Sequence, residues 1–209
     1  MPRETLIKEL CLKFDSVQRR SNLDWPAINV SAHQLVELCK KLRDEYAFDM
    51  LMDVTAVDWE KERPRFTVIY HFLSRERGHY LRVACNCEND DVPEAPSIVH
   101  LWGGANWHER EVYDMFGIKF IGHPNLKRIL MWEGYSYYPL RKEFPLAGIE
   151  TSLPAADVAE ETQAKVIAAP MMGGPFCSKP GPYMSEAEPE GKDESWTEKQ
   201  PKPEAEVNE

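Results

Sequence analysis

Residues 48–56 read FDMLMDVTA, with an apolar side chain at every second position from Phe48 to Ala56. This period of two is typical of a β-strand that has one face in a hydrophobic core. The expected inward set is Phe48, Met50, Met52, Val54 and Ala56. The stretch therefore predicts a half-buried strand, and its neighbours on both sides can be interpreted from it.

Two further segments downstream, 66–72 and 81–87, alternate in the same way. A turn at 75–78 that ends in a glycine joins them. Successive strands joined by short links favour antiparallel pairing. Upstream, residues 27–30 are apolar enough for a fourth, short strand.

Helical spacing of apolar residues precedes the strand at 48–56. Leucines and a cysteine recur every three or four positions after Ser31, which predicts a helix over 32–46. Ser31 is a good N-cap, and Gln34 stands three residues later, the spacing of a capping box. Another helix is expected over residues 4–14.

The next helix is expected after a short helical stretch that ends at Gly103-Gly104. Asn106 is the predicted N-cap, Glu109 stands at the capping-box position, and Gly117 ends the helix. Beyond it, residues 139–146 hold two prolines and read as an extended arm. The predicted fold class is α+β, with helices packed on a mostly antiparallel sheet and followed by an extended C-terminal arm.

Composition divides the 209 residues into regions. The net charge is −10, and residues 152–209 carry 12 acidic and 5 basic side chains together with 8 of the 16 prolines. We expect an N-terminal helix and linker at 1–26, a domain at 27–150, and an extended Pro/Glu-rich tail at 151–209 that is partly disordered. The N-terminus has no apolar segment typical of a secretory signal.

Several classes of site find little support. The negative charge disfavours a nucleic-acid groove, and no stretch is long and apolar enough to span a membrane. Cys85 and Cys87 share one face of a strand and read as packed core thiols. His108 lacks a second histidine four positions later, and Gly103-Gly104 is not followed by a phosphate-binding pattern. We therefore expect no catalytic residues, no metal and no cofactor in this chain.

The helix after Asn106 carries a compact set of charges around an indole. Arg110, Glu111 and Asp114 fall on one arc with Trp107 when residues are placed at helical spacing. One interpretation is a solvated face with an Arg110–Asp114 pair. The other is a surface for a partner protein, and the residues alone leave both open.

A longer signature includes this helix. The segments 109–118 (EREVYDMFGI), 120–130 (FIGHPNLKRIL) and 139–146 (PLRKEFPL) resemble the 30-kilodalton subunit family of respiratory complex I. This family is the C subunit of the proton-pumping NADH–quinone oxidoreductase. Residues 48–59 resemble its first long strand, and the resemblance covers about 27–150.

The resemblance implies a subunit without a cofactor of its own. Such a subunit packs on the large quinone-site subunit and on neighbouring iron–sulfur subunits in the peripheral arm, while FMN and the iron–sulfur clusters belong to partner subunits. Electron transfer from NADH to quinone is then an activity of the assembly. The resemblance also implies attachment to the membrane only through partners, at the cytoplasmic face of the bacterial inner membrane.

The expected interface residues come from the matching signature and include both its acidic and its basic side chains. They are Glu109, Arg110, Glu111, Asp114, His123, Arg128, Arg141 and Lys142. We expect a charge-assisted network of the helix charges that ties the helix to the arm or to a partner. His123 and Arg128 should anchor the following loop, while Arg141 and Lys142 should meet acidic or carbonyl groups of a partner.

Two alternatives stay open. A homologous subunit of a membrane-bound hydrogenase or formate-linked complex would share this signature. A stand-alone metal-dependent enzyme is an alternative of another class, for which the sequence offers no complete ligand set.

Overall fold

A computed structural model describes residues 3–21, 25–145, 148–153 and 155–166. The chain forms two compact units that divide between Glu143 and Phe144. The predicted limits of the domain at 27–150 stay predictions. The tail from 167 to 209 lies outside the described residues.

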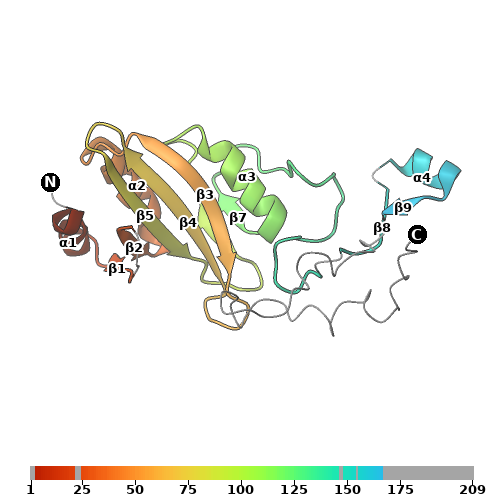
Figure 1. The fold of residues 1–209 in the computed structure, drawn as a ribbon, viewed down its shortest axis with the longest axis horizontal. Helices are drawn as coiled ribbons and strands as arrows, with labels where there is room; N and C mark the ends of the chain where they lie inside the picture. The colour runs from red at the N-terminus through yellow and green to blue at the C-terminus, as the bar shows by residue number, and fades with distance from the viewer. Residues whose placement is uncertain (1–2, 22–24, 146–147, 154, 167–209) are drawn as a thin grey trace, which may run out of the picture. The chain divides into compact units, whose positions relative to one another are not determined.

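The first unit is built on a five-stranded sheet, shown in Figure 1. Its order is β1 (Gln18–Arg19), β2 (Ala27–Val30), β5 (His79–Asn86), β4 (Phe66–Ser74) and β3 (Met50–Asp58). The pairing of β2 with β5 is parallel, and the other neighbours are antiparallel. The three long strands are thus the three predicted from alternation, and β3 lies at one edge.

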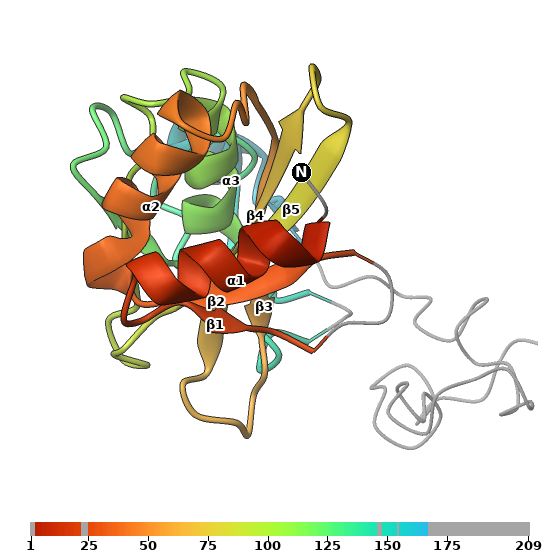
Figure 2. The same cartoon turned by 90° about the vertical axis from the view of Figure 1, so that its left-hand side faces the viewer.

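Three helices accompany this sheet: α1 (Arg3–Lys13), α2 (Ala32–Asp44) and α3 (Ala105–Phe116). Figure 2 shows α2 and α3 on the same side of β4 and β5. Their apolar stripes share one hydrophobic core with the sheet, because Leu35, Leu38, Val112, Tyr70 and Phe72 all belong to the same buried cluster. This arrangement confirms the predicted α+β class with helices on a mostly antiparallel sheet.

Short elements complete the two units. In the first unit, β6 (Glu94–Pro96) pairs in parallel with β7 (Lys119–Ile121), the strand that follows α3. In the second unit, β8 (Thr151–Ser152) and β9 (Lys165–Val166) form an antiparallel pair around α4 (Ala156–Thr162). The predicted arm at 139–146 crosses the division between the units, and its last residue lies outside the described part.

The two capping-box predictions are wrong. The Ser31 side chain makes no cap hydrogen bond, and Gln34 Oε1 accepts from Ser16 Oγ and from the Ser16 N–H, at 2.5 and 3.1 Å, instead of from the Ser31 N–H. The N-cap of α3 is Gly104, two residues before the predicted Asn106, and Glu109 is buried instead of capping. In both cases the side chain expected to cap the helix, Gln34 or Glu109, instead makes a hydrogen bond to a residue outside the helix.

The inward face predicted for 48–56 holds for only part of β3. Val54 and Ala56 are buried, but Met50 and Met52 are 41% and 45% exposed. The pairing of β3 with β4 shifts register between Leu51 and Asp53, as it does at a β-bulge. The first residues of the strand therefore present methionines to the surface.

Gly117 ends α3 in the left-handed region, with φ of 75°. A Cβ there would lie 2.6 Å from Tyr138 Cζ and 2.7 Å from Arg141 Nη2. We expect Gly117→Ala to destabilise the fold more than Gly78→Ala, whose φ is also positive but whose Cβ would meet nothing within 4 Å. Gly78→Ala should lower the free energy of unfolding by only about 1–2 kcal/mol, the cost of placing an L-residue in the left-handed region. Equal urea midpoints for the two variants would show that no close packing exists at Gly117.

Candidate functional site

Asp114 is the most heavily bonded side chain of α3. It is fully buried, and its Oδ2 accepts from the backbone N–H groups of Ile129, Leu130 and Met131 at 2.9, 2.7 and 2.9 Å. Arg128 Nη1 donates to Oδ1 at 2.6 Å. Burial alone would raise the pKa of Asp114, but these donors outweigh burial and lower it. We call residues 128–131 around this carboxylate the Asp114 nest.

The segment after the Asp114 nest folds back along the end of α3. Arg128 also donates to the Tyr137 carbonyl at 3.2 Å and lies over the ring of Tyr138. Arg141 Nε donates to the Phe116 carbonyl at 2.6 Å, and its guanidinium lies 4.5 Å from the centre of the same Tyr138 ring. Two arginines thus hold one tyrosine ring and close the 128–141 segment onto the helix.

A second buried carboxylate, at the end of β3, attaches the far end of this segment to the sheet. Asp58 accepts two hydrogen bonds from Arg65, at 2.7 and 2.6 Å, and one from the Lys142 N–H at 2.9 Å. Arg65 also pairs with Glu143. Burial would raise the pKa of Asp58, but the bonds from Arg65, Lys142 and Glu60 lower it to about 2.

Arg110 and His123 hold the loop between α3 and the Asp114 nest. Arg110 lies over the Trp107 ring and donates to the carbonyls of Lys127 and Arg128 at 3.0 and 3.3 Å. His123 Nδ1 accepts from the N–H of residue 125 at 3.0 Å, so Nε2 carries the proton that faces the carbonyl of residue 106 at 3.3 Å. Both side chains therefore act on this chain's own backbone.

The expected network is not formed as one unit. Asp114 pairs with Arg128 and not with Arg110, and Glu111 makes no ion pair within the described residues. Within this chain, Arg141 donates to the Phe116 carbonyl, and its expected contact with a partner stays a prediction. Lys142 binds Asp58 through its backbone, and its side chain is exposed.

Glu109 lies in the core. Its Oε1 accepts from the Ile98 N–H at 2.8 Å, which ties the loop before α3 to the helix. Its Oε2 has no hydrogen-bond partner among the described residues. Burial raises the pKa of Glu109 to about 7, against a smaller lowering by Ser97 and Ile98.

We expect Glu109 to make the protein less stable as pH rises from about 4.5 to 7. Over that interval the unfolded chain loses the proton that the folded chain keeps, so the free energy of unfolding falls by roughly 3 kcal/mol. Glu109→Gln keeps an acceptor for Ile98 and should remove this slope. Urea unfolding at pH 5 and pH 8 measures it, and parallel pH profiles for the two proteins would disprove the assignment.

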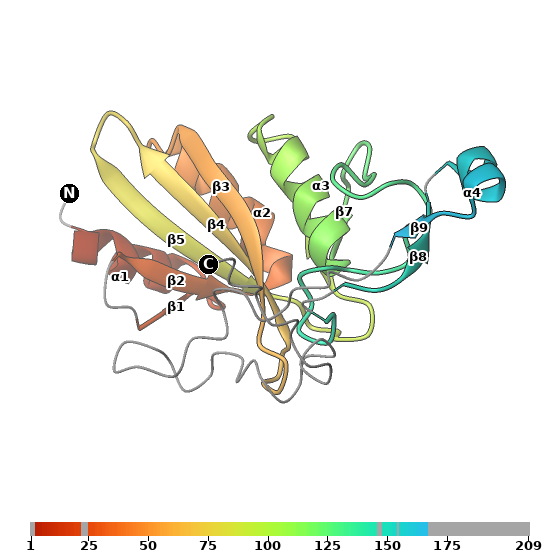
Figure 3. The same ribbon diagram turned by 45° about the vertical axis from the view of Figure 1, so that its right-hand side comes forward.

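Glu111 differs from the other acidic residues of the helix because it is exposed. It lies at a small hollow of about 90 Å³ between α3 and the edge strand β3, whose lining also includes Leu140. His108 Nδ1 contacts Asp53 Oδ1 at 3.1 Å along the same boundary. Figure 3 shows α3 beside β3.

Large apolar side chains are exposed along this boundary. Trp107 is 62% exposed and Leu140 is 53% exposed, and Met50 and Met52 are exposed on β3, the strand that α3 contacts. We group these exposed side chains with Glu111 as the α3–β3 face, whose members are Met50, Met52, Trp107, Glu111 and Leu140. The sequence analysis missed the two methionines, because the alternation predicted that they would be buried.

Other kinds of site have no visible basis in the part of the chain that the structure describes. No group of three or more His, Cys, Asp or Glu side chains there could hold a metal ion. No helix there is long and apolar enough to cross a membrane. Cys85 and Cys87 are buried as predicted, and burial raises the pKa of each thiol to about 12.

Comparison with known proteins places the signature in a family. Residues 28–150 match the family described as "Respiratory-chain NADH dehydrogenase, 30 Kd subunit". The C subunit of NADH-quinone oxidoreductase from Acidithiobacillus ferrooxidans is 41% identical over 155 residues, which cover 69% of this chain and 76% of that protein. The C 2 subunit of the enzyme from Rhizobium etli is 44% identical over 126 residues, 59% of this chain and 66% of that protein.

A solved structure has a similar fold. A chain of the membrane-bound sulfane sulfur reductase, an archaeal respiratory membrane complex, superposes with a TM-score of 0.57 at 21% identity. The match covers 77% of this chain and 91% of that one. The family match and the two relatives show that the chain belongs to the 30-kilodalton subunit family of respiratory-chain NADH dehydrogenase, whose members include the C subunit of NADH-quinone oxidoreductase.

Proposed function

We propose that this chain is a non-catalytic subunit in the peripheral arm of a proton-pumping NADH–quinone oxidoreductase. In this role it packs on the large quinone-site subunit through the α3–β3 face. The proposal rests mainly on the exposure of Glu111. This signature carboxylate lies beside apolar side chains and makes no ion pair within the described residues.

The other signature charges support this choice by elimination. Asp114, Arg128 and Arg141 are occupied by bonds within the chain, and Glu109 is buried in the core. Their contacts stabilise α3 and hold residues 128–141 against it. Glu111 and the side chain of Lys142 are the members of the set that remain available to a partner among the described residues.

The chemistry of the α3–β3 face suits a protein partner. Aromatic residues and methionine are enriched at protein interfaces, and an exposed tryptophan is a common binding hot spot. The face also lies at a sheet edge, where a strand lacks a neighbour on one side. A partner that covers Trp107 and the two methionines would bury apolar area and enclose Glu111.

The same proposal assigns the redox chemistry to other subunits. FMN and the iron–sulfur clusters would be held by partners, among them iron–sulfur subunits that neighbour this chain, and electrons would pass from NADH to quinone through the assembly. This chain would hold the large subunit and its neighbours in register. Attachment to the membrane would be peripheral, through partners, at the cytoplasmic face of the bacterial inner membrane.

Two pairs of matched variants test the docking face in cells that assemble the complex. Trp107→Ala is compared with Leu12→Ala, which also removes an exposed apolar side chain. Glu111→Lys is compared with Glu76→Lys on the exposed turn after β4. We expect the α3–β3 variants to lower the assembled complex on native gels, and the NADH:quinone activity of membranes, at least about tenfold.

The unfolding of the purified variants provides the control. Because Trp107 and Glu111 are exposed, their substitution should change the free energy of unfolding by less than about 1 kcal/mol. Normal assembly of both variants would contradict the proposed docking face. A complex that assembles with a hydrogenase subunit and does not oxidise NADH would contradict the proposed electron donor.

A further inference from the structure

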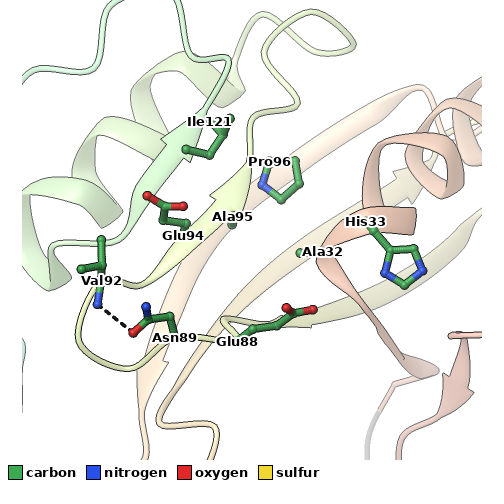
Figure 4. Close-up of a pocket in the computed structure, with 9 residues that line it drawn as sticks. All are labelled: Ala32, His33, Glu88, Asn89, Val92, Glu94, Ala95, Pro96 and Ile121. Carbon is green, nitrogen blue, oxygen red and sulfur yellow. Dashed lines mark hydrogen bonds between the residues drawn. The ribbon is translucent and has the colours of Figure 1, made fainter.

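A larger pocket lies outside the α3–β3 face and shares no residue with it. It is formed by the start of α2, the loop that follows β5, and the β6–β7 sheet, as Figure 4 shows. Its volume is about 570 Å³. None of the eight expected interface residues lines it, so the contacts described above do not account for it.

The walls of this pocket are partly apolar. Val92 is 43% exposed and Ile121 is 57% exposed, and Pro96, the last residue of β6, also lines the pocket. Pro96 and Ile121 are paired in register on the two parallel strands, so their side chains share one face of the small sheet. Ala95 is buried at the base.

Two carboxylates give the pocket its charge. Glu88 and Glu94 are exposed, and neither makes an ion pair with the described residues. Figure 4 shows them on different walls, with Ala95 between them and His33 on the α2 side. The start of α2 contributes only about half a positive charge. The residues that line the pocket therefore carry a net negative charge, and Lys119, which stands opposite Glu94 in the β6–β7 register, is not one of them.

We propose that this pocket binds an arginine or lysine side chain on an extended segment of a neighbouring subunit. Long basic side chains lay an apolar stem along an apolar wall and keep a charged head among acceptors. Here Val92, Pro96 and Ile121 provide the wall, while Glu88 and Glu94 provide the acceptors for charge-assisted hydrogen bonds. The inference rests on the proposed membership of a multi-subunit assembly and adds a second contact surface.

A photo-reactive residue at the rim tests the proposal in the assembled complex. The full chain carries p-benzoylphenylalanine at Ile121, and the cross-linked peptide is identified by mass spectrometry. We expect a peptide from another subunit with an arginine or lysine within a few residues of the attachment point. A peptide without such a residue, a peptide from this chain, or a lipid adduct would overturn the proposal.

Charge reversal supplies the second arm. Glu88→Lys with Glu94→Lys should lower the cross-linking yield at least about tenfold, because like charges would then meet in the pocket. The matched control, Glu62→Lys with Glu76→Lys, makes the same change in charge at exposed positions outside the pocket. Replacing the basic residue of the partner by an acidic residue should restore the cross-linking yield of the Glu88→Lys, Glu94→Lys variant. Equal yields for the two double variants would also overturn the proposal.

The same probe at Trp107 keeps this inference separate from the proposed docking face. Cross-linking at Trp107 with none at Ile121 would count against the pocket alone. Cross-linking at Ile121 with none at Trp107 would leave the pocket in place and count against the α3–β3 face.

Discussion

Asp114→Ala should destabilise the first unit by about 3–5 kcal/mol, the cost of removing one member of a buried charge pair. The substitution leaves three backbone N–H groups of residues 129–131 and the Arg128 guanidinium without their acceptor. Urea unfolding of the full chain, followed by tryptophan fluorescence, measures the change.

Glu111→Ala is the matched control for this prediction. It removes a carboxylate from the same helix, but from an exposed position, and should cost less than about 0.5 kcal/mol. A loss of similar size in both variants would mean that the Asp114 nest contributes little. Because the pKa of Asp114 is lowered, its contribution should be present above about pH 4 and lost as pH falls further.

Asp58→Ala should have the next largest effect, about 3 kcal/mol. It removes the acceptor of Arg65 and of the Lys142 N–H, but Arg65 keeps Glu143 as a partner, so the loss is smaller than at Asp114. The attachment of residues 139–143 to the sheet depends on the same carboxylate. We therefore expect trypsin to cut after Arg141 or Lys142 faster in the variant.

Acid titration checks the role of Asp58 independently. Its pKa is about 2 in the folded chain, so the free energy of unfolding should fall as pH drops from about 4 to 2, where the unfolded chain takes up a proton first. Asp58→Asn should reduce that slope. An unchanged slope, together with unchanged proteolysis after Arg141, would contradict the assigned contacts.

Much of the fold could be predicted from local patterns. Alternation places one face of a strand against a core, and it located β3, β4 and β5 to within a few residues. The recurrence of Leu35, Leu38 and Leu42 located α2, and Gly117 marked the end of α3. These signals act over a few residues and depend little on the rest of the chain.

The site depends on contacts that local patterns do not encode. The rule for helix neighbours favours Arg110 as the partner of Asp114, but the partner is Arg128, fourteen positions away. Asp58 meets the Lys142 N–H across 84 positions. The bulge in β3 that brings Met50 and Met52 to the surface could not be predicted from the sequence, because no glycine or proline marks its position.

Oxidative footprinting is the measurement that tests the docking face most directly, because methionine and tryptophan are readily oxidised side chains. The oxidation rates of Met50, Met52 and Trp107 are compared between the isolated full chain and the purified complex, and all three are exposed in the isolated chain. We predict that all three rates fall severalfold in the complex, while the buried Met115 stays slow in both. Unchanged rates at Trp107 and at both exposed methionines would contradict this prediction.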